Sequence, residues 1–406
     1  MPACGAPGMR ASYYSSPGYR PLNPTMDFEL DAQQREFQHA VTGFAERHLR
    51  AGALERAHGG EYPHDVARLM AAQGLFGVAL PESVGGQGGT LMDAVLAIES
   101  VAAVCPRSAD VIQAGNFGAI RVLAEYADER QRERFLNPLL AGEAVVSVGM
   151  TEPEAGSAVT DLKTTATPDG DGFRINGTKV FTTHGGYADF ILAYVRFGPG
   201  VDGIGSVIIE KGAEGFRCGK PVRFLSGDDW AQLYFEDVYV DADHVLLGPG
   251  GFRKQIAAFN VERLGNSARS LALGRYAFDC ARAYALDRKQ FDRPLCEFQG
   301  IQWKFAEMKM QLDAARLLLY RAASRADRGL PSAEDTAIAK AFCNRAGFEA
   351  ASESLQVMGG AGFSQDTLVE YCFRRTRGWM IAGGSSEMMK NRIAESVFER
   401  RFRQRP

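Results

Sequence analysis

The sequence has few cysteines, and no pattern among them would organise a fold or a metal site. Its seven cysteines are scattered at positions 4, 105, 218, 280, 296, 343 and 372, with no CxxC pair. An odd and unpaired set argues against a disulfide framework and favours a reducing compartment. The six histidines are far apart and form no HExxH motif, so metal chemistry has no support.

Long apolar runs and an excess of one charge are also missing. No run reaches the roughly 18 to 20 apolar residues that span a bilayer, so no membrane insertion is expected. The 46 basic and 49 acidic residues nearly cancel, and without a basic run there is no electrostatic case for nucleic acid. The composition, 46% hydrophobic and 23% charged, predicts a soluble, cytoplasmic globular protein.

The first 25 residues lack acidic side chains and carry Arg10 and Arg20 among many Gly, Pro, Ser and Tyr. Transit peptides share this composition, but neither an apolar core nor an amphipathic helix is evident. We therefore predict a disordered extension over residues 1–25 and a true beginning at Met26. A targeting role for the extension stays open.

The remaining chain divides into three regions, which predict an α+β fold. Apolar residues at helical spacing predict an N-terminal helical domain at 26–144. Short runs rich in β-branched and aromatic residues predict a middle antiparallel β-barrel or sandwich at 145–247. Helical spacing returns and predicts a C-terminal four-helix bundle at 248–406, where Ser332 opens one helix. The buried face of another helix there consists of Ile301, Phe305, Met308, Leu312, Ala315 and Leu319.

A glycine-rich loop over residues 80–89 interrupts the N-terminal helices. It matches neither a dinucleotide fingerprint nor a P-loop, since it has no GxGxxG after a strand and no GK[ST]. Two interpretations remain, a plain connector between helices and a segment that lines a pocket.

Two segments in the middle region suit a cofactor site. Residues 148–157 read VGMTEPEAGS and form a loop by composition, because Glu-Pro and Gly-Ser steps favour turns. Residues 179–183 read KVFTT and follow an Asn176-Gly177 pair, which predicts a tight turn between two extended runs. Backbone donors, small hydroxyls and one aromatic face suit a flat, polar-edged cofactor. The alternative is an ordinary loop and hairpin of a β-domain.

MTEPxAGS followed by NGxKxFxT resembles the flavin-binding signature of the acyl-CoA dehydrogenase family, and the resemblance runs from about Asp27 over nearly the whole chain. It implies FAD as the cofactor. It also implies that Ser157 contacts the CoA thioester arm of the substrate. The residues that it assigns to FAD in these segments are Val148, Met150, Thr151, Gly156, Ser157, Phe181, Thr182 and Thr183.

Further segments match motifs that bind FAD across a subunit interface in that family. Residues 288–299 resemble RKxFGxPLxxFQ and residues 356–360 resemble QxxGG. The resemblance implies a homodimer or homotetramer. The additional FAD contacts that it implies are Arg288, Gln290, Phe291, Gln299, Gln356, Gly359 and Gly360, with Ser385 and Glu387 near the C-terminus. Taken alone, an Arg-Lys pair at a helix end and a Gly-Gly step are ordinary helix-terminus features.

The resemblance implies removal of an α-proton by a carboxylate base, while the β-hydride passes to N5 of FAD. The segment WMIAGGSSE resembles the family motif IYEGTxE, but the position of its usual base is Gly383 here. A subgroup that includes isovaleryl-CoA dehydrogenase carries the base on an earlier helix, and the matching residue is Glu262. We predict that Glu262 is the base. The alternatives are a locally paired surface glutamate at 262, and Glu387 as a rival base.

The same resemblance suggests how an acyl-CoA substrate is held. Gly383 and Gly384 imply room near its Cα or Cβ, which predicts a branched or bulky acyl chain. Arg263 is expected to hold the CoA arm and Gln87 to contact the acyl end. An electron-transfer flavoprotein is the usual electron acceptor in the family. Two alternatives stay open: a relative that desulfinates, oxygenates or reduces its substrate, and a catalytically silent acyl-CoA-binding scaffold.

Overall fold

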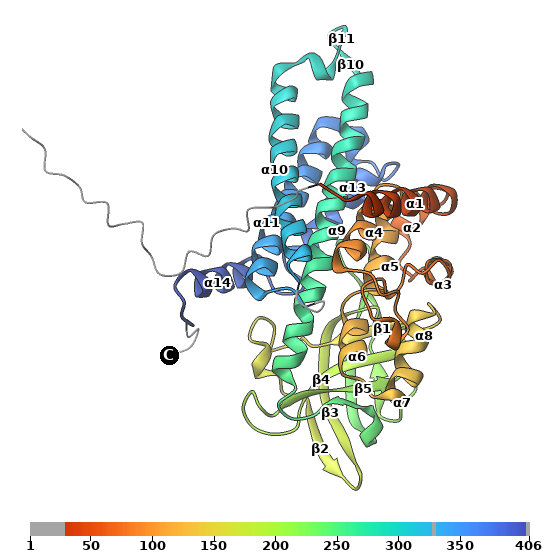
Figure 1. Cartoon of the computed structure of the whole chain (residues 1–406), viewed down its shortest axis with the longest axis vertical. Helices are drawn as coiled ribbons and strands as arrows, with labels where there is room; N and C mark the ends of the chain where they lie inside the picture. Colours follow the sequence, from red (N-terminus) through yellow and green to blue (C-terminus); the bar gives the residue numbers. More distant parts are fainter. Residues whose placement is uncertain (1–28, 327–329, 403–406) are drawn as a thin grey trace, which may run out of the picture.

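The computed structural model describes residues 29–326 and 330–402, so the extension predicted at 1–25 and the start predicted at Met26 lie outside the described residues. Helices precede and follow a β-sheet, which makes the fold α+β, as predicted (Figure 1). Within these two ranges, no helix has both the length and the apolar character needed to cross a membrane.

The N-terminal part is built around one buried helix, α4. Thr90 caps it, since its hydroxyl accepts a hydrogen bond from the Asp93 amide at 3.2 Å. Ten residues of α4 are buried, as expected for a helix that is apolar on all sides. The elements of this part are α1 (Ala32–His48), α2 (Ala53–His58), α3 (His64–Ala72), η1 (Glu82–Val84), α4 (Leu91–Ala102), η2 (Pro106–Ser108), α5 (Ala109–Ala114), α6 (Ala119–Tyr126), α7 (Glu129–Gln131), η3 (Arg132–Leu136) and α8 (Asn137–Leu140).

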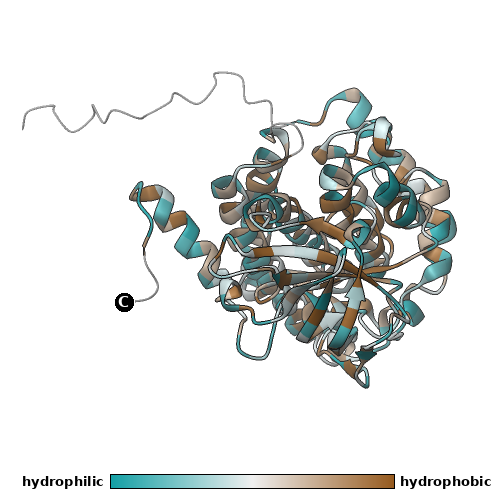
Figure 2. Cartoon of the chain, turned by 90° about the horizontal axis from the view of Figure 1, so that it is seen from below, coloured by the Kyte–Doolittle hydropathy of each residue, from teal (hydrophilic) through white to brown (hydrophobic). Residues whose placement is uncertain are grey.

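The middle part is one sheet in the order β6-β8-β3-β2-β4-β5-β9, with β1 paired to β4 and β7 to β8. Its strands carry much of the hydrophobic sequence there (Figure 2). The strands are β1 (Val146–Gly149), β2 (Thr165–Asp169), β3 (Gly172–Thr183), β4 (Phe190–Arg196), β5 (Ile204–Glu210), β6 (Phe216–Cys218), β7 (Val222–Arg223), β8 (Asp229–Val240) and β9 (Val245–Leu247), with the short turns η4 (Val159–Asp161) and η5 (Ala242–His244).

Two details of the sheet differ from the sequence-based prediction. The pairing is not purely antiparallel, because β1 runs parallel to β4 and β2 meets β4 in parallel at one position. Strand composition does not show which distant strand a segment will join. The tight turn predicted at Asn176-Gly177 is wrong: both residues lie inside β3, where the pairing with β8 shifts register. A Cβ on Gly177 would lie 2.5 Å from Thr164 Oγ1, so close packing at a bulge explains this glycine.

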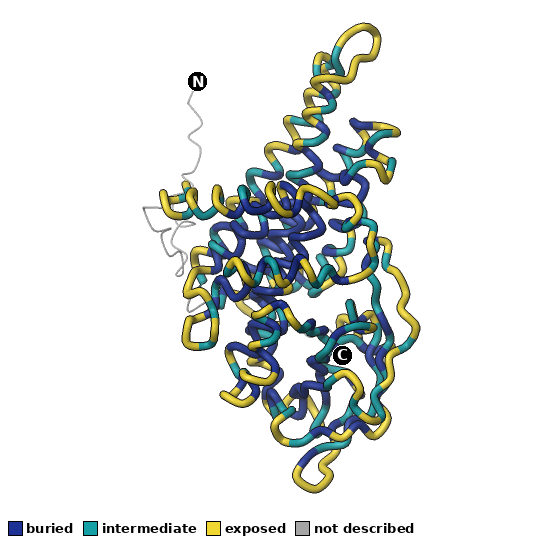
Figure 3. Tube along the Cα trace, turned by 90° about the vertical axis from the view of Figure 1, so that its right-hand side faces the viewer, coloured by how far each residue is buried: buried dark blue, intermediate teal, exposed yellow. Residues whose placement is uncertain are grey.

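The C-terminal part is helical and is dominated by α9, whose 36 residues span about 54 Å. This helix runs from the sheet to the β10–β11 hairpin, which projects from the body and is exposed (Figures 1 and 3). The elements are α9 (Phe252–Asp287), β10 (Lys289–Gln290), β11 (Arg293–Pro294), η6 (Leu295–Glu297), α10 (Gln299–Ser324), α11 (Ala333–Met358), α12 (Gly360–Phe363), α13 (Leu368–Trp379) and α14 (Ser386–Val397).

The predicted helix signals in this part are largely confirmed. Along α10, Met308, Leu312, Ala315 and Leu319 are buried, whereas Ile301 and Phe305 nearer its start are only partly buried. At the start of α11, the Ser332 hydroxyl accepts a hydrogen bond from the Asp335 amide at 3.0 Å.

A cluster of buried charges joins the three parts of the chain. The N-terminal helices contribute Arg107 and Asp110, and the turn before β8 contributes Asp228. In the C-terminal part, Arg269 lies on α9 and Arg375 lies on α13. Arg107 contacts Asp110 at 2.8 Å and Asp228 at 3.1 Å, Arg375 pairs with both aspartates, and Arg269 pairs with Asp110. Burial opposes ionisation, but the arginines outweigh it and hold the pKa of both aspartates below the usual range. Both carboxylates are therefore ionised at neutral pH.

We expect Asp228→Asn to destabilise the fold by about 3–5 kcal/mol, because two arginines would lose a buried counter-charge. Denaturant unfolding would measure the loss. The control is Asp229→Asn, which removes the neighbouring carboxylate from its pair with the exposed Arg223 and should cost no more than about 1 kcal/mol. Equal losses in the two variants would contradict a special role for the cluster.

Candidate active site

Glu262 lies on the buried side of α9, where three segments meet. Its Oε1 accepts hydrogen bonds from Gln113 Nε2 and, at 3.5 Å, from Asn266 Nδ2. No described residue hydrogen-bonds its Oε2. That oxygen faces Gly118, where an added Cβ would lie 3.1 Å away. One oxygen of the carboxylate is therefore held and the other is left open.

The surroundings of Glu262 raise its proton affinity. Burial raises the pKa of its carboxyl group, and this effect exceeds the opposing influence of Arg269, the Gln113 hydrogen bond and Lys340. The side chain is only partly buried, so it is not sealed inside the protein. The surface glutamate considered from the sequence is thus not what the structure contains, since no ion pair within 4.0 Å involves Glu262 among the described residues.

The C-terminal loop that contains Gly383 packs against the same part of α9. Arg263 Nε donates a hydrogen bond to the Gly383 carbonyl at 3.1 Å, and its Nη1 donates to Asn260 Oδ1 at 2.9 Å. Arg263 therefore ties the loop to the helix that carries Glu262.

The space expected beside the two glycines of this loop is not found along their Cβ directions. A Cβ at Gly383 would lie 3.1 Å from Asn266 Nδ2 and 3.5 Å from Lys340 Cε. A Cβ at Gly384 would lie 2.9 Å from Met389 Cε. Both glycines also have positive φ, 71° and 95°, a backbone conformation that favours glycine. Backbone geometry and close packing account for the pair as well as a wide acyl pocket does.

An exposed aromatic surface lies at the end of β3. Phe181 is 56% exposed and has a φ of 54°, which is strained for a bulky residue. Its ring lies 4.7 Å from that of Trp230 and 6.4 Å from that of Phe224, between centroids. Thr183 is exposed as well. Thr182 is buried, and its hydroxyl finds no hydrogen-bond partner among the described residues.

A buried ion pair shapes the neighbouring loop. Lys179 Nζ, at 0% exposure, lies 2.7 Å from Glu152 Oε1. The same carboxylate accepts hydrogen bonds from the Lys163 and Thr164 amides, which pins the loop that starts after β1. Burial lowers the pKa of Lys179 to about 8, with Glu152 opposing this shift. Burial alone would raise the pKa of Glu152, but Lys179 and the hydrogen bonds to the carboxylate outweigh this effect and keep the pKa below its usual value.

The predicted loop residues lie around this ion pair. The Val180 amide bonds to the Thr151 carbonyl at 2.9 Å, which brings the loop next to Phe181. Val148 and Met150 are partly buried against a small apolar cluster. Gly156 and Ser157 are exposed. The structure thus brings most of the predicted residues of the two middle segments together.

The remaining predicted residues do not join this site within one chain. Arg288 follows Glu262 by 26 positions, about 39 Å along α9. Phe291 at the hairpin tip is 88% exposed. All members of this remote set are exposed, namely Arg288, Gln290, Phe291, Gln299, Gln356, Gly359 and Gly360.

Three other predicted contacts have local roles in the structure. The exposed Gln87 lies against Gly74, where an added Cβ would meet its Oε1 at 3.1 Å. Ser385 caps α14 by accepting a hydrogen bond from the Met388 amide at 3.4 Å. Glu387 is exposed in the first turn of that helix. No described contact links any of them to Glu262, and their ligand roles stay predictions.

Several residues of the site went unnoticed in the sequence. Gln113, which bonds Glu262, and Lys340, whose charge acts on it, lie far away in the chain, so no local spacing marks them. The sequence did point to Glu152 and Lys179, because Glu152 belongs to the first of the two middle motifs and Lys179 to the second.

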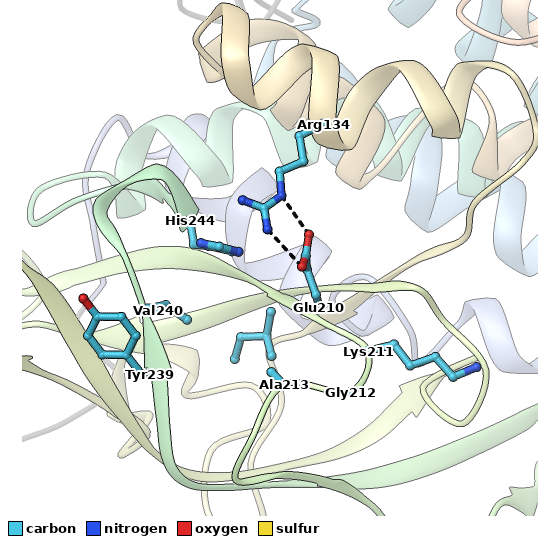
Figure 4. A pocket seen from close by; sticks show the side chains of 9 residues that line it. Arg134, Glu210, Lys211, Gly212, Ala213, Tyr239, Val240 and His244 are labelled. Atoms are coloured by element: carbon cyan, nitrogen blue, oxygen red, sulfur yellow. Dashed lines mark hydrogen bonds and ion pairs between the residues drawn. The ribbon is translucent and has the colours of Figure 1, made fainter.

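A separate pocket lies between η3 and the sheet (Figure 4). Arg134 points into it, and its Nε and Nη2 donate hydrogen bonds to the two carboxylate oxygens of Glu210, at 2.9 and 3.0 Å. Because these two charges satisfy each other, neither Arg134 nor Glu210 is available as a catalytic group.

Comparison with known proteins gives the family. The models of the N-terminal, middle and C-terminal domains of acyl-CoA dehydrogenases match residues 31–143, 147–238 and 249–398. These matches cover most of the chain, which therefore belongs to the acyl-CoA dehydrogenase family.

Individual relatives are similar over their whole length. The short-chain specific acyl-CoA dehydrogenase of Clostridium acetobutylicum is 33% identical over 92% of this chain and 100% of its own. A 3-sulfinopropanoyl-CoA desulfinase of Paraburkholderia xenovorans is 31% identical over 93% of this chain and 99% of its own. The structure of butyryl-CoA dehydrogenase from Megasphaera elsdenii matches with a TM-score of 0.86 and 32% identity, covering 92% of this chain and 100% of that one.

We expect Lys179→Met to loosen the loop at 150–164, because Glu152 would be left buried without its counter-charge. Hydrogen exchange at the Lys163 and Thr164 amides should then accelerate at least tenfold. Lys163→Met is the matched control, since that lysine is exposed and pairs with Glu154. Unchanged exchange in Lys179→Met would show that the ion pair does not hold the loop.

Proposed function

We propose that the protein is an FAD-dependent acyl-CoA dehydrogenase in which Glu262 removes the α-proton of an acyl-CoA thioester. The observation that supports this best is the position of Glu262 beside the loop that lacks the usual base. Asn266 contacts the Glu262 carboxylate and also lies where a Cβ at Gly383 would point. A carboxylate on α9 thus stands next to the place of the one missing from the loop. This would group the protein with the subgroup of isovaleryl-CoA dehydrogenase.

Glu262 has the properties that a general base needs. Gln113 and Asn266 hold Oε1, so Oε2 remains to accept the α-proton. Glycine at 118 keeps side-chain atoms away from that oxygen. The raised pKa brings its basicity closer to the working pH of an enzyme. FAD, when bound, supplies the hydride acceptor for the β-carbon.

The aromatic surface at the end of β3 fits a flat cofactor. An exposed Phe181 on a strained backbone is costly for stability alone, and such strain is common where a ligand binds. Met150, Thr151 and Thr183 lie around it and would contact the ring system, while Ser157 would meet the CoA arm. The remaining FAD contacts lie around the β10–β11 hairpin, from Arg288 to Gln299, and at the end of α11, from Gln356 to Gly360, and we assign them to a second subunit.

Exposed apolar residues on α10 support this homo-oligomer. Trp303, Met310 and Leu317 are 61%, 57% and 45% exposed. They recur every seven residues, which places them on one side of the helix, as in helices that pack against a partner. A second copy covering this stripe would complete the homodimer or homotetramer that we propose.

The substrate and the electron acceptor are proposed on the family resemblance. A branched or bulky acyl chain is proposed because glycine replaces the usual glutamate at 383, and the packing along the Cβ directions of Gly383 and Gly384 does not add to its support. An electron-transfer flavoprotein would reoxidise the enzyme. A chain in the structure of the electron transferring flavoprotein of Acidaminococcus fermentans resembles this one with a TM-score of 0.86 and 30% identity, covering 92% of this chain and 99% of that one.

Anaerobic mixing with straight, branched, aromatic and acidic acyl-CoAs tests the proposal. Loss of flavin absorbance with one class would establish dehydrogenation and identify the substrate class. A yellow protein that forms product without bleaching would instead support a non-dehydrogenating relative such as a desulfinase. A colourless protein that FAD does not reconstitute would support the silent scaffold.

We expect Glu262→Gln to retain FAD and bound acyl-CoA but to slow flavin reduction by about 10²- to 10⁴-fold, as is common for loss of a positioned base. Rapid-mixing absorbance measures the rate. Glu387→Gln serves as the control, because that exposed carboxylate is the rival base. The base assignment fails if Glu387→Gln loses the activity and Glu262→Gln keeps it.

We expect the double substitution Trp303→Glu and Met310→Glu to dissociate the oligomer and to release FAD with it, because part of the FAD site would come from the partner. Sedimentation and flavin content would be measured on the same sample. Glu307→Gln changes an exposed residue of the same helix without adding charge to the stripe. Full flavin retention by a monomeric variant would contradict the shared site.

A further inference from the structure

Lys340 on α11 is a buried lysine with almost no compensation. It is 1% exposed, and its Nζ donates one hydrogen bond, to the Trp379 carbonyl at 2.8 Å. No carboxylate of a described residue lies within ion-pairing distance, 4.0 Å, of its Nζ. Burying an ammonium group in this way is costly, so a position without a nearby counter-ion calls for a function.

The structural role of Lys340 does not explain its charge. The Trp379 carbonyl already accepts a second hydrogen bond, from Asn344 Nδ2 at 2.7 Å. A neutral side chain at 340 would therefore leave that carbonyl satisfied. The local packing therefore does not require a positive charge at position 340.

The charged groups that face Lys340 come from α9. Glu262 favours its protonated form and Arg263 disfavours it, while burial lowers the pKa of Lys340 to about 7. Glu262 in turn faces Arg269 on its own helix and Lys340 on α11, and both lower its pKa against the effect of burial. From α13 Lys340 meets the Trp379 carbonyl, and Arg392 on α14 acts on Arg263.

We propose that Lys340 is a positioning residue whose buried positive charge favours the ionised, proton-accepting form of Glu262. The proposal rests on the proposed function of Glu262 as the base. Lys340 lies on the same side of Gly383 as Asn266: a Cβ at Gly383 would be 3.5 Å from Lys340 Cε and 3.1 Å from Asn266 Nδ2, and that Nδ2 also contacts the Glu262 carboxylate at 3.5 Å. Because the Lys340 side chain is almost completely buried, its charge acts on Glu262 through the protein interior. A charge in such a dry setting acts over a longer distance than in water.

The sign of the effect follows from charge. Protonated Lys340 stabilises the carboxylate of Glu262, so removing the lysine charge raises the pKa of Glu262. The pH at which half of the base is ionised then moves upward. Because the two groups interact, the observed midpoint belongs to the pair.

The test is the ionisation of Glu262 in the full-length protein as purified. Infrared difference spectra over a pH series report its protonated carboxyl group, and Glu262→Gln identifies the band. We expect the midpoint to rise by about one pH unit in both Lys340→Met and Lys340→Gln, a tenfold smaller ionised fraction below the midpoint. Lys340→Gln keeps a donor for the Trp379 carbonyl, and Lys211→Met, at an exposed site, should leave the midpoint unchanged.

The pH dependence of flavin reduction by butyryl-CoA and isovaleryl-CoA gives a second readout, which should shift in the same direction. An unchanged midpoint in both Lys340 variants overturns the proposal, and so does failure of both to fold, which would make Lys340 structural. If the infrared midpoint shifts but Glu262→Gln still reduces flavin normally, the charge effect stands and the assignment of the base fails.

Discussion

The pairing of Arg269 with Asp110 sets the geometry on which the site depends. Arg269 lies two helical turns after Glu262 on α9, and Gln113 lies one turn after Asp110 on α5, so each pair shares a helix face. Fixing Arg269 against Asp110 therefore also aligns Gln113 with Glu262. On the other side, the Arg269 guanidinium lies 3.8 Å from the ring centre of Trp379, whose carbonyl anchors Lys340.

Sequence patterns predicted the features that local chemistry determines. The α+β order and the cap at Ser332 follow from periodicity and capping residues. They did not predict the parallel pairing of β1, nor the bulge at Gly177, where close contact with Thr164 overrides the turn preference of Asn-Gly. The roles of Gln113 and Lys340 could not be predicted from the sequence because they depend on packing between helices that are distant in the chain. Asn266 is one turn from Glu262 on α9, but its position against the loop at Gly383 is a tertiary feature too. The family resemblance alone pointed to Glu262.

The proposed FAD-binding residues form two separate groups in one chain, which links the assembly of the protein to its chemistry. One group gathers around Phe181 near the sheet, and the other lies at the far end of the long α9 helix. The stiffness of that helix sets their separation, so no small movement of one chain joins them. In the proposed enzyme, a subunit would therefore hold one half of its own site and lend the other half to its neighbour.

The shared position of Glu262 and Gly383 has an evolutionary consequence. Two positions about 120 residues apart in the chain converge on the side chain of Asn266. If Glu262 is the base, as proposed, a lineage could exchange the carboxylate between the loop and the helix by point substitutions while it stays near Asn266. Relatives in such a family would then share the residues that surround the site, whereas the sequence position of the catalytic carboxylate could differ between them.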